Sequence, residues 1–200
     1  MIDKIIANKP DSIFDILPEE LFQFDLNTDY ARSGNCWEWN YAIAKAIQPT
    51  SYAEIGVRFG YSLIPTLVAA PSLTYALGMD LEEYGNNDAT KDNLRKYYTG
   101  DCTVQLEHID SQKVTELPQY FTLINIDGCH TKECKMHDLR LAVGHCKYLL
   151  IDDYAYLVDV RSAIIDWLNE VSSDGWGKPS LIEWATLIPS FRGSYLVKFK

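Results

Sequence analysis

The chain has 200 residues, of which 47% are hydrophobic, and this length and composition suit one compact domain with a sizeable core. Its 18 lysines and arginines are outnumbered by 28 aspartates and glutamates, giving a formal net charge of −10. This balance argues against the basic face that nucleic acids and anionic membranes require. We therefore expect a small-molecule substrate, with neither nucleic acid nor a membrane as partner.

The N-terminal residues carry no apolar block preceded by positive charge, because residues 1–15 mix charged and polar side chains with hydrophobic ones. Such a start encodes neither secretion nor membrane spanning, and we expect a cytoplasmic protein. The five cysteines are odd in number and scattered along a chain that is large enough to fold without disulfides, so we expect reduced thiols.

Residues 1–50 are predicted to form an N-terminal cap segment that starts irregularly and ends in a helix. Asn35 can cap this helix and Pro49 stops it. Its apolar face has helical spacing, which favours core packing, and consists of Trp37, Tyr41, Ala44 and Ile47. Trp39 lies off this face and is the more exposed candidate for a lid over a substrate.

Residues 51–200 are predicted to form the main domain, in which strands and helices alternate. Strands are expected at 52–55, 74–79, 103–109, 121–126 and 148–151, and helices at 62–70, 89–98, 132–143 and 158–171. Two further strands, 181–188 and 194–199, are joined by too few residues for a helical crossover, so they should pair antiparallel. Residues 172–179 read as a long loop. The order implies an α/β fold with a mostly parallel sheet covered on both faces.

Three short acidic signatures each follow an apolar run, at 54–60, 126–130 and 150–154. The first turns through glycines between a strand and a helix, where backbone N–H groups can approach a ligand. The other two place acids just past strands, at the edge where open α/β sheets bind their ligands. Together they indicate a nucleotide-type cofactor beside a metal held by carboxylates.

From about Tyr52 onward the chain resembles the class I S-adenosylmethionine-dependent methyltransferases, whose doubly wound, Rossmann-like, seven-stranded sheet carries a reversed C-terminal strand. Glu54, Gly56 and Gly60 resemble the first motif of that family, which holds the methionine end of the cofactor. Ser62 opens the helix that follows, and the resemblance places it in the same cofactor site.

The resemblance extends to the ribose and adenine ends of the cofactor. Asp80 ends the strand that follows and is similar to the acid that accepts hydrogen bonds from the ribose hydroxyls. Its position, twenty residues after Gly60, also satisfies the general dinucleotide pattern. Asp110 and Ser111 stand where the family commonly contacts the adenine ring.

The metal signature resembles one branch of the family, the magnesium-dependent O-methyltransferases that act on catechols and on sugars, the macrocin and mycinamicin enzymes among them. Asp127, Asp152 and Asp153 resemble its three-carboxylate site, and hard Mg²⁺ prefers carboxylate oxygens. His130 stands where sugar-modifying members can place a general base. The resemblance implies that a substrate diol binds Mg²⁺ at Asp127, that His130 removes a proton, and that the alkoxide attacks the sulfonium methyl.

Each signal also has a simpler interpretation. Glycine suits any tight turn after a strand, and Asp152 and Asp153 would serve equally as caps of the next helix. His130 would equally satisfy a turn carbonyl. Cys134 and His137 are three residues apart on a predicted helix, which is one element of a zinc site, but no Cys-x-x-Cys pair supports it.

Three functions therefore remain: a metal-dependent O-methyltransferase of a small polyhydroxylated metabolite, a metal-independent methyltransferase, and a non-catalytic protein that keeps the fold. Tyr154 and Tyr156 follow the acidic pair and are candidates for the acceptor site, although Tyr154 would also pack on the last helix. The chain has little room for a substrate-recognition insertion, so we expect an acceptor site that is open or completed by a second subunit in a homodimer.

Overall fold

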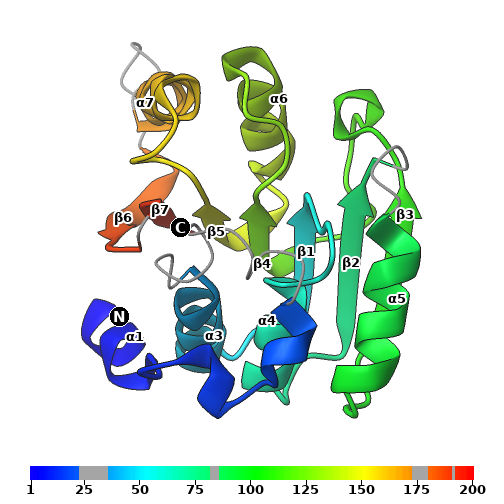
Figure 1. Cartoon of the computed structure of the whole chain (residues 1–200). Helices are drawn as coiled ribbons and strands as arrows, with labels where there is room; N and C mark the ends of the chain where they lie inside the picture. The colour runs from blue at the N-terminus through cyan, green and yellow to red at the C-terminus, as the bar shows by residue number, and fades with distance from the viewer. Residues whose placement is uncertain (23–35, 82–85, 173–179, 191) are drawn as a thin grey trace.

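The computed structural model of the chain describes residues 1–22, 36–81, 86–172, 180–190 and 192–200. Its centre is a seven-stranded sheet with the strand order β3-β2-β1-β4-β5-β7-β6 (Figure 1). The strands are β1 (Ser51–Ile55), β2 (Tyr75–Asp80), β3 (Thr103–His108), β4 (Phe121–Ile126), β5 (Cys146–Ile151), β6 (Ile182–Ile188) and β7 (Ser194–Phe199).

The pairing of the strands confirms the predicted fold class. β1 pairs in parallel with β2 and β4, and the sheet continues in parallel to β3 on one side and β5 on the other. β7 inserts between β5 and β6 and is antiparallel to both. The carboxyl ends of β1, β2, β4 and β5 therefore meet at one edge of the sheet, where the acidic signatures were expected to gather.

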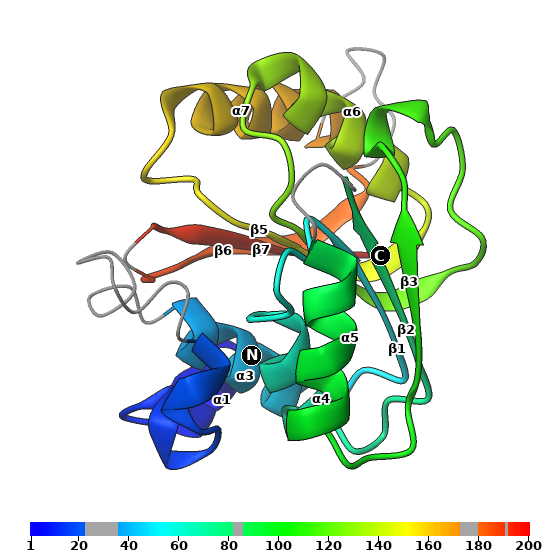
Figure 2. The ribbon, with the colours of Figure 1, turned by 45° about the vertical axis from the view of Figure 1, so that its right-hand side comes forward.

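Helices cover both faces of the sheet (Figures 1 and 2). α6 (Lys132–Ala142) and α7 (Val158–Ser172) lie side by side on one face. The other face carries α1 (Ile2–Asn8), α3 (Cys36–Ile47), α4 (Leu63–Ala69) and α5 (Asn86–Tyr97). None of the described helices is both long and apolar enough to cross a membrane.

Each face of the sheet has its own buried core. On the α6 and α7 face, Trp167 and Leu139 pack with Ile126 and Ile151 from β4 and β5. On the opposite face, helix residues such as Ile43 and Leu67 pack with strand residues Tyr52, Ala76, Leu123 and Leu150. Burial on both faces explains why the central strands read as continuous apolar runs rather than alternating ones.

The N-terminal cap segment differs in part from the prediction. It begins with α1, which the sequence did not predict, and continues through two 3₁₀ helices, η1 (Ile13–Asp15) and η2 (Glu19–Phe22). Trp37 stacks on Phe22 with ring centroids 4.2 Å apart. Trp39 is buried, with 6% of its surface exposed, so its assignment as the exposed lid candidate was wrong. The proposed cap Asn35 and most of the loop 172–179 lie outside the described residues.

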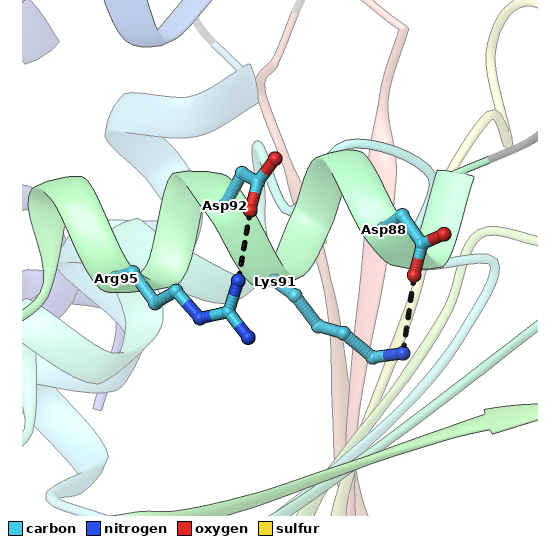
Figure 3. Close-up of polar contacts among 4 residues, drawn as sticks. All are labelled: Asp88, Lys91, Asp92 and Arg95. Atoms are coloured by element: carbon cyan, nitrogen blue, oxygen red, sulfur yellow. Dashed lines mark hydrogen bonds and ion pairs between the residues drawn. The ribbon is translucent and has the colours of Figure 1, made fainter.

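The outer face of α5 is covered by charged pairs one helical turn apart (Figure 3). Lys91 lies 3.3 Å from the Asp88 carboxylate, and Arg95 lies 3.0 Å from that of Asp92. Such exposed pairs contribute little stability. Contacts on the inner side of α5, described below, therefore determine how this helix is held against the sheet edge.

Candidate functional site

The loop after β1, residues 56–60, packs directly on the turn after β4. Gly56 has a φ of +94°, and a Cβ at this position would lie 2.4 Å from the backbone oxygen of Asp127. The Gly56 N–H donates to the Met79 carbonyl at 2.8 Å, which ties the loop to the end of β2. Only glycine combines this backbone conformation with so close an approach.

α5 and β2 hold the outer side of the same loop. The Thr90 hydroxyl donates to the Arg58 carbonyl, and the Asn93 amide donates to the Phe59 carbonyl at 2.9 Å. The Asp80 carboxylate accepts from the backbone N–H of Arg58 and from that of Leu81, the latter at 2.7 Å. Asp80 therefore lies beside the glycine loop and contacts it, at the end of β2 as the sequence predicted.

Glu54 lies beneath the loop rather than in it. Its carboxyl group is fully buried and accepts hydrogen bonds from the hydroxyls of Tyr52, at 2.9 Å, and Ser62, and from the Asn125 amide at 3.3 Å. Burial raises its pKa to about 8, although the hydrogen bonds from Ser62 and Tyr52 act in the opposite direction. The structure thus brings Glu54 and Ser62 together in an internal network that supports the loop.

Asp110 and Ser111 follow β3 and begin the short 3₁₀ helix η4 (Ser111–Lys113). The Asp110 carboxylate caps it by accepting from the Gln112 N–H at 3.0 Å. His137 on α6 contacts the Ser111 carbonyl through its Nε2 at 2.9 Å, which anchors this segment to α6. Among the described residues, Cys134 and His137 belong to no group of three potential metal ligands, so nothing supports the zinc site considered above.

The acids after β4 and β5 meet a histidine at the edge of the sheet. Asp127, His130 and Asp153 each offer a ligand atom, and these atoms lie within 4.8 Å of one another. His130 Nε2 lies 3.0 Å from the Asp153 carboxylate, and hydrogen bonds to Asp127 and Asp153 raise its pKa to about 9. In the described part of the chain, this is the one such group of three or more acidic, histidine or cysteine side chains.

Asp153 is held in a strained conformation within this cluster. Its φ is +67°, which is uncommon for a residue other than glycine. Its carboxylate is buried and lies 3.5 Å from the Arg192 guanidinium in addition to its contact with His130. Burial would raise its pKa, but the hydrogen bond from His130 and the charge of Arg192 outweigh burial and lower it.

Asp152 lies beside the cluster with a different environment. Its carboxylate is buried and accepts a hydrogen bond from the Ser194 hydroxyl at 2.7 Å. Burial and then the negative charges of Asp127 and Asp153 raise its pKa to about 7. The three predicted metal ligands are therefore neighbours, but His130 rather than Asp152 stands within ligand distance of the other two.

The N-terminal cap segment reaches this cluster through Cys36, the first residue of α3. Its thiol interacts with the backbone of Arg192, and its pKa is raised by burial and by the negative charge of Asp152. On the other flank, the rings of Tyr154 and Tyr195 lie 5.2 Å apart, and Tyr154 packs against the core beside α7. Tyr156 is 51% exposed.

No protein-family model matches the sequence, and no curated protein matches it. Solved structures match it over its whole length. A methyltransferase from Podospora anserina bound to SAH is 18% identical, with full coverage of this chain, 95% of that one and a TM-score of 0.65. An O-methyltransferase from Bacillus cereus in complex with SAH is 16% identical, with full coverage of both chains and a TM-score of 0.66. The O-methyltransferase TomG from Streptomyces achromogenes, in complex with SAM and involved in tomaymycin synthesis, is 14% identical, with full coverage of this chain, 94% of that one and a TM-score of 0.65.

This chain has the class I methyltransferase fold. The predicted cofactor residues on that fold lie in two neighbouring places. Glu54, Gly56, Gly60 and Ser62 belong to or support the loop after β1, and Asp80 contacts that loop. Asp110 and Ser111 lie one strand further along the edge, after β3, which pairs with β2. Their roles towards a cofactor stay predictions.

Sequence reasoning missed two residues that contact the acidic pair after β5. Arg192 and Ser194 flank the start of β7 and pair with Asp153 and Asp152 respectively. The only sequence signal was that the antiparallel hairpin must return to β5, which places residues before β7 next to the acidic pair. Buried acids also require partners, but that rule does not say which residues supply them.

Proposed function

We propose that this protein is an S-adenosylmethionine-dependent methyltransferase that methylates a hydroxyl group of a small polyhydroxylated molecule, sugar-like or catechol-like, with the help of a divalent cation. The observation that carries the proposal is the contact between the glycine loop and the Asp127 turn. A cofactor held by that loop would lie beside the Asp127, His130 and Asp153 cluster. Methyl donor and acceptor would then meet at one edge of the sheet.

Cofactor binding is assigned to the glycine loop and to Asp80. The loop is fixed by Thr90, Asn93 and Asp80, so its backbone is preorganised before any ligand arrives. Asp80 presents the carboxylate that suits ribose hydroxyls. The solved O-methyltransferases of the same fold hold SAH or SAM, which supports a cofactor site on this fold.

The acidic cluster fits a divalent cation by its donor set. Two carboxylates and an imidazole converge within 4.8 Å, and the Asp153 carboxylate is buried. Asp152 adds negative charge beside them. Carboxylates suit Mg²⁺ and Mn²⁺, whereas an imidazole ligand would favour Zn²⁺ or Fe²⁺. A bound cation would lower the pKa of a substrate hydroxyl.

The side chains of the chain itself would orient the acceptor and move its proton. Asp127 and Asp153 hold the His130 ring, and half of the His130 side chain is exposed, so a substrate hydroxyl can reach it. The pKa of His130 is about 9 without a cation, and a cation held by the neighbouring carboxylates would lower it. The neutral imidazole would then accept the proton of the reacting hydroxyl, whose oxygen would attack the sulfonium methyl. Because the donor is already activated, alignment of the two reactants supplies much of the rate.

Calorimetric titration tests both halves of the proposal. The protein is titrated with S-adenosylmethionine in Mg²⁺ and again in excess chelator, and then with Mg²⁺ and Mn²⁺ alone. Micromolar cofactor binding together with a separate metal isotherm supports the proposal. Methyl transfer to catechols and sugars, followed by product mass and repeated with chelator, then identifies the acceptor class. Absence of cofactor binding contradicts the proposal.

A second candidate function is favoured by the ion pairs of the cluster. Asp153 already faces His130 and Arg192, and Asp152 is bonded to Ser194, so the acids are partly compensated without a cation. In that case the protein would be a methyltransferase that needs no metal. Its activity would survive the chelator, and the titration with metal alone would give no isotherm.

A homodimer remains part of the proposal, because a chain of 200 residues leaves little room for an insertion that would enclose an acceptor. Sedimentation of the protein at several concentrations, with and without S-adenosylmethionine, tests for a second subunit.

A further inference from the structure

Two cysteines lie beside the acidic cluster and take no part in the function proposed above. Cys129 is in the turn between Asp127 and His130, and Cys134 is in the first turn of α6. Neither is disulfide-bonded, and both are partly accessible to solvent. Their position next to His130 makes any chemistry of their thiols relevant to the site.

The local structure brings the two thiols together around Thr131, which caps α6. The Cys129 sulfur lies 3.6 Å from the Thr131 hydroxyl oxygen, and the same oxygen accepts from the backbone N–H of Cys134 at 3.4 Å. Each thiol also affects the pKa of the other, so the two are neighbours. A bond between them would close a short loop.

From this geometry we infer that Cys129 and Cys134 form a reversible, peroxide-driven disulfide that controls the His130 turn. One thiol reduces the O–O bond of a hydroperoxide, becoming a sulfenic acid with release of water when the oxidant is hydrogen peroxide. The second thiol attacks that sulfur and displaces its hydroxyl group as a second water. The pair loses two electrons and two protons, which the peroxide takes up.

The remaining thiols are placed differently. Burial raises the pKa of the thiols of Cys36, Cys102 and Cys146, and Cys146 is buried in the core. An intramolecular disulfide needs a second sulfur within reach, and the Thr131 cap brings Cys134 next to Cys129. The Cys129 and Cys134 pair is therefore the expected site of intramolecular oxidation.

Disulfide formation would change the turn that carries His130. Bonded sulfurs are about 2.05 Å apart, so Cys129 would move from the Thr131 hydroxyl towards α6. His130 directly follows Cys129, so this movement would alter its 3.0 Å contact with Asp153. Loss of methyl transfer on oxidation, and its recovery with a dithiol, rests on the proposed function, whereas the disulfide itself does not.

Mass spectrometry tests the disulfide without an activity assay. The folded protein is treated with hydrogen peroxide, its free thiols are alkylated, and it is digested with trypsin. Lys132 lies between the two cysteines, so they fall on separate tryptic peptides unless a disulfide links them. We expect a linked pair spanning residues 114–132 and 133–135, an intact mass lower by two hydrogen atoms before alkylation, and reversal by a dithiol.

Matched variants decide the assignment. Cys134→Ser should abolish the linked peptide, whereas Cys102→Ser should leave it unchanged. Cys129 oxidised to the sulfinic acid with Cys134 still alkylated would overturn the inference, as would a linkage to any other cysteine or between two chains. A linked peptide with no change in S-adenosylmethionine or metal binding would support the disulfide but contradict its control of the site.

Discussion

Gly56 and Asp127 belong to different loops, yet the missing Cβ of Gly56 would lie 2.4 Å from the Asp127 backbone oxygen. The first residue opens the loop assigned to the cofactor, and the second opens the acidic cluster. A displacement of either loop must therefore displace the other. This contact couples the proposed donor site to the proposed acceptor site through the backbone alone.

Gly56→Ala should damage both sites at once, since alanine would meet backbone atoms that cannot rotate away. We expect lower thermal stability and weaker binding of both S-adenosylmethionine and metal, measured by thermal unfolding and calorimetry. Gly144→Ala is the matched control, because Gly144 also has a positive φ, of +79°, but nothing lies within 4 Å of its Cβ position. If both variants lose the same amount of stability and binding affinity, conformational strain rather than the contact with Asp127 explains the effect.

Asp80→Asn should weaken S-adenosylmethionine binding and leave metal binding intact. The change removes a charged acceptor for the ribose hydroxyls and weakens the bonds to the N–H groups of Arg58 and Leu81. Hydrogen bonds to charged groups contribute about 1.5–3 kcal/mol, so we expect a loss of about tenfold or more in affinity. Calorimetry measures it.

The control for this change is Asp92→Asn, which removes a carboxylate from the exposed outer face of α5 (Figure 3). Exposed ion pairs of that kind contribute little to stability. The cofactor affinity of the Asp92→Asn variant should therefore equal that of the unaltered protein. An Asp80→Asn variant with unchanged affinity would refute the ribose assignment.

Asp153→Asn should weaken metal binding more than Asp152→Asn does. Asp153 stands in the cluster with Asp127 and His130, whereas one oxygen of Asp152 is occupied by the Ser194 hydroxyl. Titration with Mg²⁺ or Mn²⁺ measures both variants, with Asp166→Asn on the exposed side of α7 as the control. Equal losses of metal affinity in the two variants would favour the three-carboxylate site that the sequence predicted.

The contrast between fold and site in this chain has a physical basis. The alternation of strand-like and helix-like segments and the short hairpin between β6 and β7 are local sequence patterns. They predicted a sheet with a reversed strand, and the structure confirms it. The gathering of Asp127 and Asp153 follows from the same topology, because parallel strands end at one edge. The partners of these acids do not follow from it. Arg192 reaches Asp153 only through the tertiary return of β7, and α1 has too few residues for its pattern to stand out.

Glu54→Gln should remove part of the pH dependence of stability. The Glu54 carboxyl has an ordinary pKa of 4.5 and a pKa of about 8 in the folded protein. Between these values the folded state binds a proton that the unfolded state releases. The free energy of unfolding therefore falls as the pH rises, by up to about 1.4 kcal/mol per pH unit for this group.

Glutamine keeps the shape of the side chain and does not titrate, so the variant should gain stability relative to the unaltered protein as the pH rises from about 5 to about 8. Urea unfolding in the presence of a chelator measures this difference and keeps metal from the acidic cluster. Glu116→Gln makes the same chemical change at an exposed position and should show no such gain. Since Asp152 and His130 also have raised pKa values, both proteins should keep a residual slope of the same sign. A Glu54→Gln curve parallel to that of the unaltered protein would mean that the buried carboxyl stays ionised, held by the donors Tyr52, Ser62 and Asn125.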